Sequence, residues 1–443
     1  MPKYFGTDGV RGRAGVELTV ELALAVAQAA ARAFRPEKVL MARDTRASGP
    51  ALSAACAAGF LSQGVQILDA GILPSPAVSH LLPREKIPLG LVVSASHNPP
   101  EDNGLKFYNS QGYKLSVAEE ERVEAALEGP GSPVTERFGE IRAWPEALDR
   151  YLALLRSFVP EPRLAGVKLV VDCAHGATIV AAPCLFGELG PSLSFLGLEP
   201  DGWRINATGA AAPKALQEAV RAEGADLGIG LDGDGDRAVF VDETGRIVEG
   251  DQLMAALAPH LWEWGEIREK AVVFTVLANM GAEKYLRERG FAVIRVPVGD
   301  RHVAWAMREK DVDLGGEPSG HIVFRRYTVT GDGLLTGLLV LSYLRRLGKS
   351  LGELVAPVPL YPQVRRDVPV SNREQVMADL KVREAIARAQ ARLAHGRLVV
   401  RPSGTQPVIR ILAEGPEENR LSAVVEFLAE VVRAADQRIS GDT

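Results

Sequence analysis

One pattern, a strand followed by a polar loop, a helix and a second strand, occurs three times in this chain of 443 residues. The copies cover residues 38–69, 167–196 and 270–296, and in each a glycine separates the helix from the second strand. A strand–helix–strand unit with short turns joins two parallel strands, and its helix covers the sheet that they form. Because the copies begin roughly 130 and 103 residues apart, they are spaced too widely for a solenoid and predict three related α/β domains.

Breaks rich in proline or glycine divide the chain at residues 160–162, 250–251 and 356–362. After the last break, strands alternate with one helix expected over 373–394, a pattern typical of an α+β domain. The predicted fold class is therefore α/β, with four domains around a central cleft. These are three related α/β domains with mixed sheets at 1–158, 159–252 and 253–360, and a C-terminal α+β domain at 361–443.

Each unit is followed by another apolar strand that ends in a polar loop, at 94–99, 232–237 and 315–321. Ligands of open parallel sheets bind beyond the carboxyl ends of the strands. The three matching loops therefore predict one shared active-site cleft, and the last domain adds a fourth polar loop at 401–407.

The loop at 232–237 carries three aspartates, Asp232, Asp234 and Asp236, which alternate with glycine. At a period of two, all three carboxylates can turn to one side. Two such charges about 4 Å apart repel by roughly 4 kcal/mol at an effective dielectric near 20. A hard divalent cation relieves this repulsion, and a site with few oxygen ligands from the protein favours Mg²⁺.

Two alternatives remain open for these aspartates. They can form an acidic turn without a metal, or, together with Glu243, they match positions 1, 3, 5 and 12 of a calcium-binding EF-hand loop. Arg237 stands where that loop needs glycine, and the flanking segments are typical of strands. Despite these departures from the EF-hand loop, a non-catalytic calcium-binding protein is kept as the second hypothesis for the chain.

The loop at 94–99 offers a serine nucleophile beside the expected metal site. A phosphoserine bound to magnesium would explain both features, but spacing alone does not distinguish Ser94 from Ser96. In the last domain, two arginines surround a turn rich in hydroxyls and backbone amides, which is the composition of a phosphate cradle. Its residues are Arg401, Ser403, Gly404, Thr405 and Arg410, and the residues suited to sugar hydroxyls are Glu317, Ser319 and His321.

The net charge of −5 and the pI near 5.9 argue against a nucleic-acid or anionic-membrane partner. Anionic small molecules remain possible partners. The three cysteines form no even framework and are expected to be buried, which fits a reducing compartment. The N-terminus lacks a secretion signal, and the apolar run at 333–344 is too short to span a bilayer. The sequence predicts a soluble cytoplasmic protein.

Taken together, the motifs resemble those of the α-D-phosphohexomutase family, most closely of its bacterial branch that acts on glucosamine phosphates. Their order and spacing agree over nearly the whole chain. The matching segments are 5–12, 44–49, 94–99, 102–107, 232–237, 299–301, 316–321, 330–333 and 401–410.

The resemblance implies roles for individual residues. Ser96, rather than Ser94, would be the phosphoserine, and its phosphate would hold Mg²⁺ together with the three aspartates. Arg11, Lys106 and Arg237 would surround the transferred group, with Lys106 and His321 as candidates for proton transfer. The substrate would be bound by His97, Asp300, Arg301, Glu317, Ser319, His321, Arg401, Ser403, Gly404, Thr405 and Arg410.

The activity that the resemblance implies is the interconversion of glucosamine 6-phosphate and glucosamine 1-phosphate in amino-sugar metabolism, by a monomer or a homodimer. It would pass through phospho-Ser96 and glucosamine 1,6-bisphosphate, which is both intermediate and activator. Gln406 and Pro318 depart from the residues usual in the family. They leave open a preference for mannose or glucose phosphates.

Overall fold

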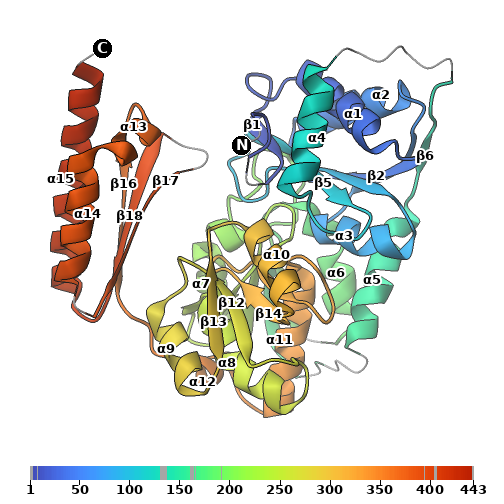
Figure 1. The fold of residues 1–443 in the computed structure, drawn as a ribbon. Coiled ribbons are helices and arrows are strands. Elements are labelled where there is room, and N and C mark those ends of the chain that lie inside the picture. The colour runs from blue at the N-terminus through green and yellow to red at the C-terminus, as the bar shows by residue number, and fades with distance from the viewer. Residues whose placement is uncertain are drawn as a thin grey trace.

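Four sheets follow one another along the chain and define domains I to IV. The computed structural model describes residues 3–6, 8–129, 137–159, 164, 166–190, 192–393, 395–403 and 407–441. Domains I to III lie together with helices packed around their sheets, and domain IV stands to one side of them (Figure 1). The three α/β domains and the antiparallel last sheet confirm the predicted fold class. The domain boundaries expected at 158, 252 and 360 stay predictions.

Domain I holds a six-stranded mixed sheet in the order β1-β5-β4-β2-β3-β6. The strand β2 and its neighbours β3 and β4 are parallel, whereas β5 runs antiparallel to β4. The elements are β1 (Val10–Arg13), α1 (Val20–Phe34), β2 (Lys38–Arg43), α2 (Gly49–Leu61), β3 (Gln66–Ile72), α3 (Ser75–Arg84), β4 (Leu89–Val93), β5 (Asp102–Asn109), α4 (Val117–Glu128), β6 (Ile141–Ala143) and α5 (Glu146–Phe158).

Domains II and III repeat this central arrangement of three parallel strands and one antiparallel strand. Domain II contains β7 (Lys168–Asp172), α6 (Ala182–Gly187), β8 (Ser192–Leu196), α7 (Lys214–Glu223), β9 (Leu227–Leu231), β10 (Ala238–Val241) and β11 (Ile247–Val248). Domain III contains α8 (Gly250–Glu263), β12 (Ala271–Thr275), α9 (Met280–Glu288), β13 (Ala292–Val296), α10 (Asp300–Lys310), β14 (Leu314–Gly316), β15 (Ile322–Phe324), α11 (Gly333–Leu347) and α12 (Leu351–Val355). In each domain the predicted polar loop joins the last parallel strand to the antiparallel one, so the three loops occupy equivalent positions.

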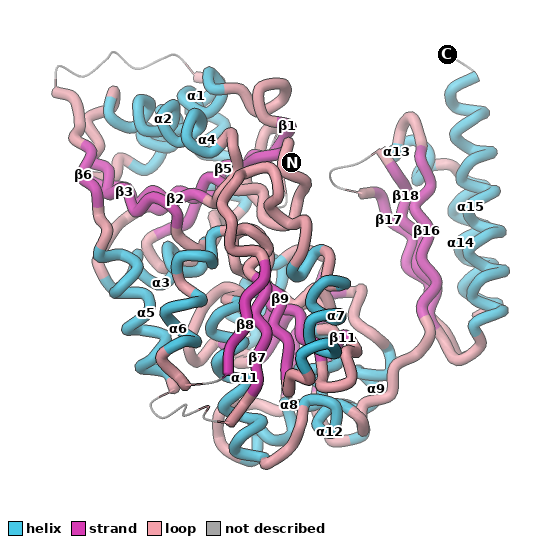
Figure 2. The backbone as a smooth tube through the Cα atoms, turned by 180° about the vertical axis from the view of Figure 1, so that it is seen from behind, coloured by secondary structure: helices cyan, strands magenta, loops and turns pink. Residues whose placement is uncertain are grey.

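Domain IV is an antiparallel sheet in the order β16-β18-β17, with helices on one face (Figure 2). Its elements are β16 (Gln363–Pro369), α13 (Arg373–Ala378), α14 (Leu380–Arg392), β17 (Arg397–Pro402), β18 (Val408–Glu414) and α15 (Glu418–Gly441). The single helix predicted over 373–394 is wrong, because Asp379 leaves the helical conformation. Its side chain accepts a hydrogen bond from the Val382 amide at 3.1 Å and caps a second helix.

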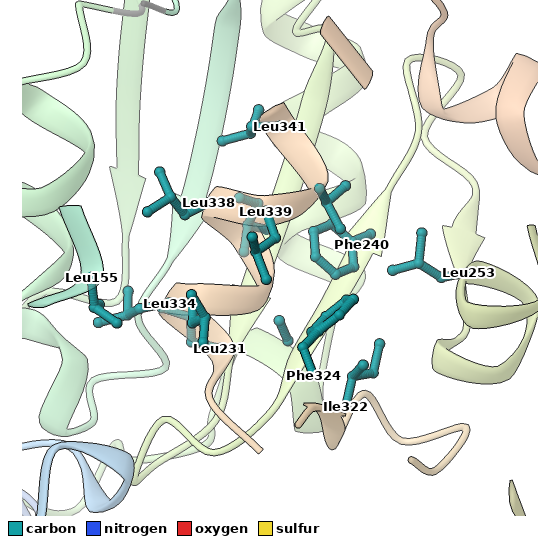
Figure 3. Packing of buried hydrophobic residues seen from close by; sticks show 14 of the residues in the cluster. Leu155, Leu231, Phe240, Leu253, Ile322, Phe324, Leu334, Leu338, Leu339 and Leu341 are labelled. Atoms are coloured by element: carbon teal, nitrogen blue, oxygen red, sulfur yellow. The ribbon is translucent and has the colours of Figure 1, made fainter. Parts of the chain in front are cut away.

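The helix α11 lies at the centre of a core that domains I to III share (Figure 3). Its apolar residues Leu334, Leu338 and Leu339 belong to the same buried cluster as Leu155 of domain I and Phe240 of domain II. The apolar run at 333–344 is thus an interior helix. None of the helices that the structure describes has the length and apolarity needed to cross a membrane. Domain IV has a separate core of its own.

A single passage of the chain, over residues 356–362, leads from domain III into domain IV. Beside it, the buried carboxylate of Glu414 accepts a hydrogen bond from the Met280 amide at 2.8 Å and pairs with Arg397 at 2.5 Å. The side-chain amide of Asn279 donates a hydrogen bond to the Tyr361 carbonyl oxygen and accepts one from the Tyr361 backbone amide. These contacts attach domain IV at the start of α9.

Two of the three cysteines are buried as expected, but Cys184 is exposed. The helix α6 is only one and a half turns long, and Cys184 lies on its solvent side.

Candidate active site

Ser96 lies in the loop between β4 and β5 with a left-handed backbone, at φ +52°. Its Oγ donates a hydrogen bond to Asp232 Oδ2 at 2.6 Å. Its carbonyl oxygen accepts hydrogen bonds from Arg46 at 2.9 Å and from Asn206 at 2.7 Å. A non-glycine residue adopts this conformation only where its surroundings enforce it, so the loop holds the Ser96 hydroxyl in a defined direction.

The neighbouring serine, Ser94, has a different environment. Its Oγ donates to Asp44 Oδ2 at 2.6 Å and accepts a hydrogen bond from the Ser96 amide at 3.0 Å. Ser94 therefore supports the loop, whereas the hydroxyl of Ser96 faces the aspartates. This contrast separates two serines that spacing left equivalent.

Arg46 organises the serine loop, and sequence reasoning gave it no role. It is fully buried and forms an ion pair with Asp44 at 3.0 Å. Its guanidinium also donates to backbone carbonyl groups of the loop, including those of Ser96 and Asn98 at 2.9 Å each. The segment 44–49 belonged to the resemblance, but only the fold shows that this arginine satisfies the buried carbonyl groups.

Asp232, Asp234 and Asp236 lie in the turn between β9 and β10, with ligand atoms within 4.8 Å of one another. Burial, followed by the charges of Asp236 and Asp234, raises the pKa of Asp232 to about 7. Among the described residues, Oδ1 of Asp234 and Oδ1 of Asp236 are buried without a hydrogen-bond partner. Crowded carboxylates with unpaired oxygens fit a hard divalent cation, which would satisfy both atoms.

The EF-hand arrangement on which the calcium-binding alternative depends is wrong. Glu243 lies beyond β10 and accepts hydrogen bonds from Ser350 Oγ at 2.6 Å and from the Gly352 amide, at the start of α12. The strands β9 and β10 form an antiparallel pair, whereas an EF-hand loop joins two helices. Glu243 is therefore held away from the three aspartates.

Two lysines accompany the aspartates, Lys106, which is buried, and Lys114, whose side chain is 10% exposed. Lys106 Nζ lies 2.6 Å from Asp234 and 3.1 Å from Asp8. Lys114, which sequence reasoning missed, pairs with Asp8 and Asp300 and lies 3.9 Å from Asp236. Burial on its own would lower the pKa of each lysine, but the facing carboxylates outweigh it and keep both ammonium groups charged. Lys114 thereby connects carboxylates of domains I, II and III.

A cleft of about 380 Å³ lies beyond these loops and is lined from all four domains. Most of the predicted substrate residues line it, together with Arg11 and Arg237, which were predicted to surround the transferred group. The substrate residues are His97, Asp300, Glu317, Ser319, Arg401, Ser403 and Arg410. Gly404 and Thr405, like Gln406, lie outside the described residues.

The imidazole of His97 lies beside the serine, with Nδ1 at 3.5 Å from Ser96 Oγ. The positive charge of Arg237, followed by burial and by Arg11, lowers the pKa of His97 to about 2. The ring is therefore neutral, and it can accept or donate a hydrogen bond without adding charge to the cleft.

Two predicted residues, Arg301 and His321, are not among the residues that line the cleft. Arg301 pairs with Glu120 of α4 at 2.5 Å and thereby fastens α10 to domain I. His321 is 1% exposed, and its Nε2 accepts a hydrogen bond from the Gly331 amide at 2.9 Å. Its Nδ1 faces Asp236 at 3.7 Å. His321 therefore supports the turn that carries the three aspartates, and the predicted contacts of Arg301 and His321 with a sugar stay predictions.

Asn206 joins the serine loop to the aspartate loop, and sequence reasoning missed it too. Its amide nitrogen donates to the carbonyl oxygens of Ser96 at 2.7 Å and Asn98 at 3.1 Å. Its Oδ1 accepts a hydrogen bond from the Gly233 amide at 2.9 Å. The residue is left-handed, at φ +63°, a region that asparagine tolerates better than most residues. An asparagine in a predicted loop is only a weak sign of such a role, because asparagine is common in turns of every kind.

We expect Asn206→Gly to lower kcat by about 10²-fold, because a small misplacement of reacting groups has effects of this size. Glycine keeps the left-handed backbone and removes only the bridging amide. Steady-state kinetics and thermal unfolding would be measured together. Asn206→Asp is the matched control, since it retains the acceptor for Gly233 and loses the two donated bonds. An unchanged kcat in Asn206→Gly would show that the bridge does not position Ser96.

The four domains of the phosphoglucomutase/phosphomannomutase family match the chain in order. The alpha/beta/alpha domains I, II and III match residues 2–132, 149–245 and 249–361, and the C-terminal domain matches residues 367–431. The chain belongs to this family, and the resemblance seen in its sequence is confirmed.

Curated proteins that are similar to this chain over its full length are named phosphoglucosamine mutases. The protein from Desulforudis audaxviator is 43% identical over 451 residues and covers 100% of both chains. The protein from Geobacillus thermodenitrificans is 41% identical over 444 residues, covering 98% of this chain and 99% of its own.

Solved structures share the fold over almost the whole chain. A phosphoglucomutase/phosphomannomutase family protein from Burkholderia thailandensis has a TM-score of 0.79 at 24% identity and covers 98% of each chain. The N-acetylphosphoglucosamine mutase of Aspergillus fumigatus, solved with GlcNAc-6P and magnesium, has a TM-score of 0.66 at 19% identity. This match covers 98% of this chain and 96% of the other.

Proposed function

We propose that this protein interconverts glucosamine 6-phosphate and glucosamine 1-phosphate, with phospho-Ser96 as the phosphoryl donor. The observation that carries the proposal is the hydrogen bond from Ser96 Oγ to Asp232, which sets the hydroxyl against three buried carboxylates. Full-length relatives that are 41% and 43% identical bear the name phosphoglucosamine mutase. This supports the choice of a hexosamine substrate.

The reaction consists of two phosphoryl transfers. In the first, the free hydroxyl of the sugar attacks the phosphorus on Ser96, a P–O bond to the sugar forms and the P–O bond to Ser96 breaks. One proton passes overall from the sugar hydroxyl to the serine oxygen, and glucosamine 1,6-bisphosphate results. In the second transfer the other phosphate of the turned sugar returns to Ser96, which restores the phosphoserine and leaves the product.

The residues of the cleft divide this work between them. The charged Lys106, with Arg11 and Arg237, offsets the charge of the group in transfer. A magnesium ion held by the three aspartates would supply further charge neutralisation at the phosphoryl oxygens. Glu317 and Ser319 bind sugar hydroxyls.

At the far end of the cleft, Arg401, Ser403 and Arg410 bind the phosphate that is not transferred. We assign Gly404 and Thr405 to the same contact.

The test is Mg²⁺-dependent conversion of glucosamine, glucose and mannose 6-phosphates to their 1-phosphates, each with a trace of its bisphosphate. We expect the highest kcat/KM for glucosamine 6-phosphate. A higher value for glucose or mannose would keep the mechanism and assign the chain to phosphoglucomutase or phosphomannomutase activity, which Pro318 in the cleft wall makes a real alternative. Absence of any conversion would overturn the proposal.

A further inference from the structure

The sheet of domain IV has one face packed against its helices and another that lines a groove. The groove has a volume of about 430 Å³, and its walls include Arg365, Arg401, Arg410, Leu277, Val399 and Leu412. Three of these residues, Arg365, Arg401 and Arg410, also line the catalytic cleft. Groove and cleft are therefore continuous, and we call these three residues the arginine strip.

The strand register places the arginine strip on one face. Arg401 on β17 lies directly opposite Arg410 on β18. Arg365 on β16 lies opposite Leu412, which is two residues beyond Arg410 and therefore on the same face. Arg365 thus lies on the same face as the Arg401–Arg410 pair, at a level of the sheet two residues further from the phosphate loop.

The arginine strip brings three positive charges together beside acidic residues. Arg410 lies 3.5 Å from Asp367, and Arg365, which donates to the neutral side chain of Gln363 at 2.6 Å, also faces the charge of Glu249 in the cleft wall. Burial, followed by the charge of Arg410, lowers the pKa of Arg401, as expected where two guanidinium groups lie close together. Such a surface attracts a ligand with more than one negative charge.

The proposed reaction creates a ligand of this kind. The 1,6-bisphosphate carries a phosphate at each end and must turn between the two transfers. During the turn, the phosphate at Arg401 and Arg410 has to leave its position, and a ligand with no other contact would then be lost to solvent. A further guanidinium one step along the sheet offers the leaving phosphate a second contact.

We propose that Arg365 provides a second phosphate position, which retains the bisphosphate intermediate while it turns within the cleft. This inference rests on the proposed function and extends it to a residue that the family motifs of the sequence did not include. Arg365 acts on the intermediate after the first transfer, so its loss affects release of the bisphosphate rather than transfer from phospho-Ser96.

The test compares Arg365→Gln with wild type and with Arg366→Gln. Arg366 is the matched control, because it borders the groove but not the cleft, and its side chain pairs with Glu426 of α15 at 2.8 Å. Phosphorylated protein is mixed with limiting glucosamine 6-phosphate and Mg²⁺, and the bisphosphate that escapes is separated and counted.

We expect Arg365→Gln to release about tenfold more bisphosphate per turnover, as the loss of one charge-assisted hydrogen bond predicts. The rate at which phospho-Ser96 loses its phosphoryl group stays unchanged. Arg366→Gln behaves as wild type, and Arg365→Lys, which keeps the charge, recovers part of the retention.

Three outcomes would count against the inference or its foundation. Equal release from Arg365→Gln and Arg366→Gln would overturn the second phosphate position. Equally raised release from Glu249→Gln would also overturn it. Glu249 lines the cleft with Arg365, so this result would show that Arg365 acts by pairing with Glu249 of another domain and not by binding phosphate. Failure of the wild-type protein to dephosphorylate with any sugar phosphate would instead overturn the proposed function.

Discussion

Replacing Ser96 by alanine is expected to lower the mutase rate by at least about 10⁴-fold, because no other group can carry the phosphoryl group between the two transfers. The fold should be retained. The loop is held through the Ser96 carbonyl oxygen by Arg46 and Asn206, and alanine leaves these hydrogen bonds in place. The rate would be measured with glucosamine 6-phosphate, and phosphorylation by intact-protein mass.

Ser94→Ala is the matched control. It removes the hydrogen bonds to Asp44 and from the Ser96 amide, so we expect a moderate loss of rate with phosphorylation of Ser96 intact. Near-normal turnover in Ser96→Ala would refute the covalent scheme. Loss of phosphorylation in Ser94→Ala alone would move the nucleophile to Ser94.

The second large effect concerns Asp232. We expect Asp232→Asn to abolish the rise in melting temperature that Mg²⁺ gives the wild-type protein and to lower turnover by about 10³-fold, because a ligand and charge of the metal loop are lost. Without metal the variant should be more stable than wild type at pH 8. Asparagine Oδ1 can still accept the hydrogen bonds that Asp232 Oδ1 takes from the Gly235 and Arg237 amides, and its Nδ2 can donate to Ser96 Oγ, which now donates to Asp232 Oδ2.

The sign follows from the pKa of Asp232, which is raised to about 7 in the folded protein. The folded state binds this proton more tightly than the unfolded state, so the free energy of unfolding falls as the pH rises from about 4 to about 7. The stability gained in Asp232→Asn should therefore grow across this window and level off above it, reaching a few kcal/mol, on the order expected for such a shift. Thermal unfolding in EDTA between pH 5 and pH 8 measures it. A constant difference across this range would contradict the argument.

Much of this architecture was predictable because the chain repeats its unit. The three copies indicated three related domains, and equivalent positions in those domains implied that the loops of Ser96, Asp232 and Glu317 would share a cleft. Apolar runs such as Leu89–Val93 are strands buried on both faces, and that pattern is visible without a structure.

What could not be predicted depends on contacts between distant segments. Arg46, Lys114 and Asn206 each contact at least one partner that lies 50 or more positions away, so no local pattern reveals their roles. The partners of Arg301 and His321, which belong to other domains, could not be predicted for the same reason. A motif identifies a residue but does not say which domain its side chain will contact. The break at Asp379 was missed because the helical pattern continues on both sides of the cap.

The hydrophobic core is divided between the domains, and this division affects which part of the site opens first by local unfolding. The cluster around α11 joins domains I to III, and domain I holds a second cluster on the other face of its sheet, whereas domain IV has no share in either cluster and depends on a small core of its own. Local opening of a small unit requires less free energy than global unfolding. Arg401 and Arg410 therefore belong to the part of the molecule that opens most readily, whereas Ser96 and the three aspartates stay within the part that opens least. The chain can thus release the far end of a ligand without disturbing the groups that transfer phosphate.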